Sequence, residues 1–157
     1  FFVALGLIFL LMLLWMRSLR LACISLVANV FPVGIMLYAM VALGLTLDVA
    51  SATIAAIVLG VSIDDTIHFL YHWREAESEG MNWDEALDHT YAHAGVAAFI
   101  TTALLVVGFP VLMLAEVKTV FYFGLLTTIA ALAALLADLF LLPLLLKAWP
   151  ARPKEAS

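Results

Sequence analysis

The sequence has little charge and almost no cysteine. Only 12% of its 157 residues are charged, against about a quarter in soluble domains. The single cysteine, Cys23, excludes a disulfide framework and a cysteine-based metal site. Gly-rich phosphate loops, basic patches for nucleic acid and nucleophile motifs are also lacking. What is present is a chain that is 66% hydrophobic with a mean hydropathy of +1.16, which is typical of an integral membrane protein.

Five apolar segments approach the ~20 residues that a helix needs to cross a bilayer. They cover about residues 1–16, 21–43, 49–73, 95–115 and 121–146. Phe1 opens directly inside the first segment, so we expect the sequence to be a piece of a longer protein. The pattern predicts an all-α, polytopic membrane helix bundle over residues 1–147 and a cytoplasmic tail over 148–157.

Lysine and arginine lie almost entirely on one side of these spans. One side carries only Lys118, and the other carries Arg17, Arg20, Arg74, Lys147, Arg152 and Lys154. Because basic loops tend to stay in the cytoplasm, we predict a multi-pass protein of the cell (inner) membrane with a cytoplasmic C-terminus.

The connection over residues 74–94 has a helical pattern of its own. Gly80 is suited to end the third helix. Asn82, with Glu85 three residues later, indicates a capping box at the start of a new helix. We therefore predict a short cytoplasmic amphipathic helix over about 82–93, lying on the inner membrane surface.

Asp64 and Asp65 are adjacent in the middle of the third apolar segment. A carboxylate at the bilayer centre costs roughly 2.5–3.5 kcal/mol on insertion scales. Such residues therefore usually mark an ion path, a proton relay or a polar contact between helices. The bland interpretation is that both acids are protonated and serve only as packing.

Small residues precede Asp64 at intervals of four and form a ridge along the helix, which consists of Ala52, Ala56, Gly60, Asp64 and His68. Small residues allow a neighbouring helix to approach closely, so Gly60 is a predicted helix-packing position. His68 lies one turn from Asp64, close enough to pair with it or to pass it a proton.

Polar residues of the later spans fall at a similar depth. At ~1.5 Å per residue, the spans place Asp64, Thr101, Thr102 and Asp138 roughly 3–6 Å to the cytoplasmic side of the span midpoints. We therefore predict one interior cluster, in which carboxyl groups removed from water bind protons more readily. The alternatives are that both threonines bond their own backbone, and that Asp138 only fixes the end of its span.

His89 and His93 have the i, i+4 spacing that can chelate a metal ion. No third ligand stands at a suitable spacing, so the sequence predicts no metal site and no cofactor. His72 is interpreted as an interfacial polar residue.

The stretch Gly60-Val-Ser-Ile-Asp64-Asp65-Thr-Ile-His68 resembles a signature of the RND (resistance–nodulation–division) superfamily, most closely its MMPL and Patched-like branch. The segments Ile100-Thr-Thr102 and Ala137-Asp-Leu-Phe-Leu-Leu-Pro143 also resemble that family. The resemblance implies the C-terminal transmembrane part of a proton-driven exporter of lipids or other hydrophobic molecules. It further implies that Asp64 and Asp65, with His68 adjoining, couple proton flow to conformational change.

The partners implied by the resemblance are the N-terminal half of the same transporter, the lipid bilayer and a hydrophobic or lipid substrate. A homo-oligomer is compatible with it, and no nucleic acid is expected. The alternative function is a sterol- or lipid-sensing membrane module without transport activity. An intramembrane aspartyl protease needs two catalytic Asp on separate helices, whereas Asp64 and Asp65 are adjacent, so we expect no enzyme.

Overall fold

The computed structural model describes residues 2–46 and 49–149, and every element within these ranges is helical. The predicted all-α fold is therefore confirmed. The elements are α1 (Phe2–Met16), α2 (Leu19–Ala42), α3 (Val49–Ser78), α4 (Trp83–Thr90), the π-helical turn η1 (Tyr91–Gly95), α5 (Val96–Gly108), the 3-10 segment η2 (Phe109–Leu114), α6 (Lys118–Leu136), the π-helical turn η3 (Ala137–Leu141) and α7 (Leu142–Ala148).

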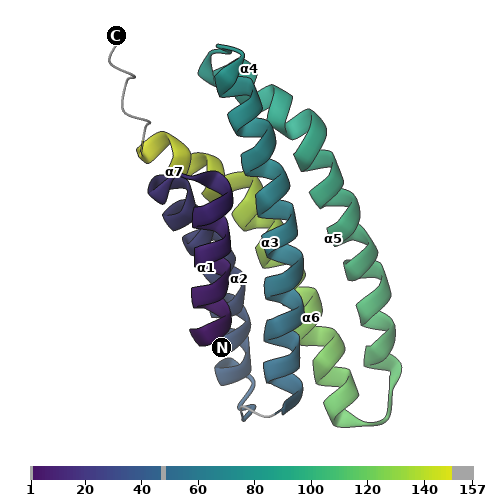
Figure 1. The fold of residues 1–157 in the computed structure, drawn as a ribbon. Coiled ribbons are helices and arrows are strands. Elements are labelled where there is room, and N and C mark those ends of the chain that lie inside the picture. The colour runs from purple at the N-terminus through teal and green to yellow at the C-terminus, as the bar shows by residue number, and fades with distance from the viewer. Residues whose placement is uncertain (1, 47–48, 150–157) are drawn as a thin grey trace.

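The helices run up and down beside one another, with α3 central between the α1–α2 pair and α5 (Figure 1). The α2, α3 and α6 helices pack mutually and form the middle of the bundle. The connection between α1 and α2, together with α4 and α7, lies at one end, which we call the α4 end (top of Figure 1).

Four helical stretches in the described part of the chain are long and apolar enough to cross a membrane. They are Leu19–Ala42, Ser51–Ser78, Trp83–Leu114 and Lys118–Ala148. The first predicted span corresponds to α1, whose 15 residues are fewer than the ~20 that a crossing requires. The predicted tail beyond Trp149, with Arg152 and Lys154, lies outside the described residues.

The helix predicted over 82–93 begins as expected, as α4, and is followed directly by further helix. The Asn82 side chain accepts from the Glu85 amide, and the Glu85 carboxylate accepts from the Asn82 amide, each at 3.0 Å. After α4, however, the chain continues through η1 into α5 without a break in helical structure. The π-helical turn joins α4 to α5, so Trp83–Leu114 is one continuous helical stretch.

Two arginines hold helix ends together at the α4 end. The Arg74 guanidinium on α3 donates a 2.6 Å hydrogen bond to the carbonyl of Met16, at the end of α1. The Arg20 guanidinium on α2 donates a 3.0 Å hydrogen bond to the carbonyl of Leu146, near the end of α7. Because the last carbonyls of a helix lack intrahelical partners, these bonds satisfy groups that would otherwise be unpaired.

The apolar core consists of two clusters separated along the bundle. The cluster at the α4 end includes Met16, Ile24, Phe69, Leu70, Leu142 and Leu146. The cluster toward the other end includes Val33, Met36, Ile54, Val58, Leu126 and Ala130. Between the two clusters, buried polar side chains occur on α2, on α3 and on the helical stretch that runs from α6 to α7.

Candidate functional site

Buried polar side chains from three elements meet between the two apolar clusters. They are Asn29 on α2, Thr66 on α3 and Asp138 on η3, each no more than 1% exposed. The Thr66 hydroxyl donates a 2.7 Å hydrogen bond to Oδ1 of Asp138, and the same hydroxyl oxygen lies 3.5 Å from Oδ1 of Asn29. The Asn29 amide nitrogen donates at 2.8 Å to the carbonyl of Ser25. We call Asn29, Thr66 and Asp138 the interior polar cluster.

The π-helical turn that carries Asp138 has a cause in the sequence. Pro143 has no amide hydrogen, so the carbonyl of Leu139, four residues earlier, loses its usual α-helical partner. The amide of Leu142 bonds the carbonyl of Ala137 instead of that of Asp138, which is the π-helical pattern. The Tyr91 hydroxyl on η1 donates at 2.5 Å to the carbonyl of Leu139 and supplies the missing partner.

The second carboxyl oxygen of Asp138, Oδ2, is buried and has no hydrogen-bond partner within the described ranges. No lysine, arginine or histidine in these ranges lies within ion-pair distance of Asp138. An unpaired buried carboxylate is costly, whereas a protonated one is not. Asp138 thus combines one hydrogen-bonded oxygen and one unpaired oxygen in a buried position.

The two adjacent acids of α3 face different surroundings. Asp65 is buried, 9% exposed, and near enough to Asp138 for an electrostatic interaction between the carboxyl groups. The side chain of Asp64 is 76% exposed, and its Oδ1 lies 3.9 Å from Nε2 of His68. The predicted closeness of Asp64 and His68 is confirmed. The prediction that Asp64 shares the dry interior is wrong for the described bundle, because successive residues of a helix point about 100° apart.

The predicted ridge of small residues exists, and all of it is exposed. Its members Ala52, Ala56, Gly60, Asp64 and His68 point away from the described helices. Apart from the backbone of its own helix, no atom lies within 4 Å of where a Cβ on Gly60 would stand. The neighbouring helix that these residues could accommodate is therefore not among the described elements.

The two predicted threonines do not join the interior polar cluster. The Thr101 hydroxyl donates at 3.0 Å to the carbonyl of Ala97 on its own helix, as one of the alternatives predicted. Thr102 is buried and lines a small apolar cavity between α3, α5 and α6, together with Thr127. Of the hydrogen bonds within the described ranges, none connects either threonine to a carboxyl group.

The sequence did not predict Asn29 as a member of the interior polar cluster, and it assigned no role to Thr66. A signal for Asn29 was available, because an amide within the apolar run 21–43 commonly makes hydrogen bonds between helices. Thr66 stands directly after the paired acids and is the residue that reaches Asp138.

Comparisons with known proteins agree with this architecture. A sequence profile of the MMPL family matches residues 1–155. A protein of Methanocaldococcus jannaschii named as a membrane protein is 34% identical over 108 residues, which covers 69% of this chain and 28% of that relative. The matched region thus covers less than a third of the relative's length. No solved structure matches the chain significantly.

Proposed function

This chain belongs to the MMPL family of the RND superfamily, and we propose that it is the membrane part of a proton-driven exporter of lipids or other hydrophobic molecules. The chain is a helical membrane module of a transporter-type family. The proposal adds the driving force, the substrate class and the residues that carry protons. It assigns the chain no enzymatic activity and requires no cofactor.

The observation that carries the proposal is a series of ionisable groups leading from the bundle interior to its surface. Asp138 lies innermost and accepts from Thr66, whose neighbour in sequence is the buried Asp65. Asp64 and His68 follow on the exposed ridge of the same helix. Ionisable residues inside a membrane are rare unless they serve a path of this kind.

Coupling follows from the cost of an unpaired charge. When Asp138 or Asp65 loses its proton, the carboxylate is left in a largely apolar interior. Movement of α3 relative to η3 that exposes the carboxylate to water, or pairs it, removes that cost. Each proton that crosses a potential of 100 mV supplies about 2.3 kcal/mol, which is enough to bias such a movement.

The exposed ridge supports a partner inside the membrane. A carboxylate such as Asp64 facing lipid is costly, so its surface is expected to meet protein or a water-filled space. Gly60 and the alanines of the ridge leave room for a closely packed helix. We propose that the N-terminal half of the same longer protein supplies this helix, and a second copy of the chain is the alternative.

For sidedness, we propose that the α4 end faces the cytoplasm of the inner membrane. Arg17, Arg20 and Arg74 lie at that end of the bundle, and Lys147 is in the last turn of α7. This placement agrees with the excess of basic residues expected in cytoplasmic connections. It also puts the C-terminus inside the cell.

The test is transport by the full-length protein in proteoliposomes with an imposed proton gradient and a fluorescent lipid as cargo. We expect Asp138→Asn, Asp65→Asn and Asp64→Asn each to abolish gradient-driven transport while membrane insertion stays intact. Asp84→Asn, at an exposed acid in the first turn of α4, is the control and should transport normally. Normal transport by all three variants would overturn the coupling role, and lipid binding with no dependence on the gradient would support the lipid-sensing alternative.

A further inference from the structure

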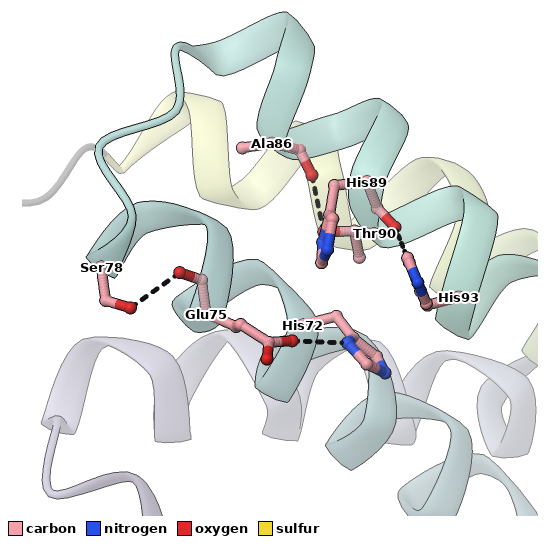
Figure 2. A network of polar contacts seen from close by, with 7 residues as sticks. All are labelled: His72, Glu75, Ser78, Ala86, His89, Thr90 and His93. Carbon is pink, nitrogen blue, oxygen red and sulfur yellow. Dashed lines mark hydrogen bonds and ion pairs between the residues drawn. The ribbon is translucent and has the colours of Figure 1, made fainter.

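Three of the four histidines of the chain lie together at the α4 end (Figure 2). His72 belongs to α3, His89 to α4 and His93 to η1. One ring nitrogen from each lies within 4.8 Å of those of the other two. The ring centroids of His89 and His93 are 4.4 Å apart, and those of His72 and His93 are 5.1 Å apart. The third ligand that sequence spacing did not reveal comes from a different helix.

Hydrogen bonds fix the tautomers of two of these rings. Nδ1 of His72 lies 3.0 Å from Oε2 of Glu75, and Nδ1 of His93 lies 2.8 Å from the carbonyl oxygen of His89 (Figure 2). A carboxylate and a carbonyl only accept, so each Nδ1 carries a hydrogen, and in the neutral ring Nε2 then has its lone pair available for a ligand bond. A carboxylate or backbone carbonyl behind the imidazole is the arrangement that orients histidine ligands in metal sites.

His89 contributes the third ring, which packs against the other two. Its Nδ1 is buried, with no hydrogen bond to any residue in the described ranges. A buried nitrogen without a hydrogen bond costs free energy unless another group binds to it. The cluster therefore offers two oriented Nε2 atoms and one imidazole with an unsatisfied nitrogen.

We propose that His72, His89 and His93 bind one first-row divalent transition metal ion, with Zn²⁺ as the best match. Imidazole nitrogen is a preferred ligand of zinc, copper and nickel, and tetrahedral three-histidine sites are typical of zinc. Zn–N bonds of ~2.0–2.1 Å put tetrahedral ligand atoms about 3.4 Å apart, so small ring rotations suffice. His93 is the exposed member of the three.

The ion joins the end of α3 to the start of the fourth span. α3 carries Asp64 and Asp65, so the metal fixes the position of the proton-carrying helix relative to α4 and η1. Three protein ligands leave a fourth position for water or another donor. Three neutral imidazoles that merely pack against one another would join the same helices without an ion, and the experiment separates the two cases.

The experiment measures Zn²⁺ binding to the full-length protein, purified without a polyhistidine tag and stripped with a chelator. Equilibrium dialysis gives the stoichiometry, and Co²⁺ substitution gives an absorption spectrum that reports tetrahedral nitrogen ligation. We expect His72→Gln, His89→Gln and His93→Gln each to bind one Zn²⁺ fewer per chain than the unmodified protein. His68→Gln, the matched control on α3, should bind the full number.

A second variant tests the orienting role of Glu75. Glu75→Gln should keep the stoichiometry and weaken the Zn²⁺ affinity about 10–100-fold, as second-layer partners of metal ligands generally do. The proposal is overturned if the unmodified protein binds no stoichiometric Zn²⁺. It is equally overturned if His93→Gln, which is exposed and not expected to disturb folding, binds the same number of ions.

Discussion

The hydroxyl of Thr66 and the carboxyl group of Asp138 form a 2.7 Å hydrogen bond between residues 72 positions apart in the sequence. Both side chains are almost fully buried. The bond links α3, which carries the paired acids, to the π-helical turn before α7. In the proposed mechanism, this bond connects the carboxyl group of Asp138 to the helix that carries Asp64.

Replacing Thr66 by valine should destabilise the bundle. The change keeps the shape of the side chain but leaves Oδ1 of Asp138 without its donor, which costs about 1–3 kcal/mol for a buried group. Thr66→Ser keeps the hydroxyl and is the control. Unfolding free energies from denaturant titration in mixed micelles give the comparison, and equal stability of the two variants would contradict the importance of the bond.

Replacing Tyr91 by phenylalanine should also be destabilising. Without the hydroxyl, the carbonyl of Leu139 has neither Tyr91 nor an amide hydrogen from Pro143, with an expected cost of about 1–3 kcal/mol. Tyr38→Phe, at an exposed tyrosine of α2, should change the unfolding free energy by less than about 0.5 kcal/mol. The measurement is the same titration, and a Tyr91→Phe variant as stable as Tyr38→Phe would argue against this role for the hydroxyl.

A methyl group at Gly124 should disturb the packing of α6 against η2. A Cβ there would stand 2.6 Å from the carbonyl oxygen of Phe109 and 3.0 Å from Cβ of Leu112, so the backbone must shift. Overpacking of this kind costs about 1–3 kcal/mol. Gly34→Ala on α2 meets nothing within 4 Å and serves as the control. Thermal unfolding of the purified protein should show a lower midpoint for Gly124→Ala only.

A large side chain at Gly60 should leave this bundle folded but impair the complete transporter. The space around Gly60 is open in the described bundle, whereas the proposed partner helix needs it. We expect Gly60→Phe to insert and unfold normally but to lose transport in proteoliposomes. Ala97→Phe, at an exposed position of α5, is the matched control and should keep activity. Full transport by Gly60→Phe would remove the argument for a partner on the ridge.

Features that depend on neighbours in sequence were predictable. The capping box of Asn82 and Glu85, the end of α3 near Gly80, the closeness of Asp64 and His68 and the backbone bond of Thr101 all involve residues within one helical turn or at a helix end. Helical geometry alone fixes such contacts. The apolar runs likewise predicted the helices, because a bilayer leaves few alternatives to a helix.

The environment of each polar group depended on contacts between distant segments. Asp64 and Asp65 are chemically identical neighbours, and the packing of other helices against one side of α3 decides that Asp65 is buried while Asp64 is exposed. His72 similarly lies close to His89 and His93 only because α4 folds back beside α3. The sequence by itself determined that this is a helical membrane protein with acids inside its spans, because hydrophobicity and helical period act locally. Which acids meet, and which lie on an exposed face, was decided by the packing of whole helices, which bring together residues far apart in the chain.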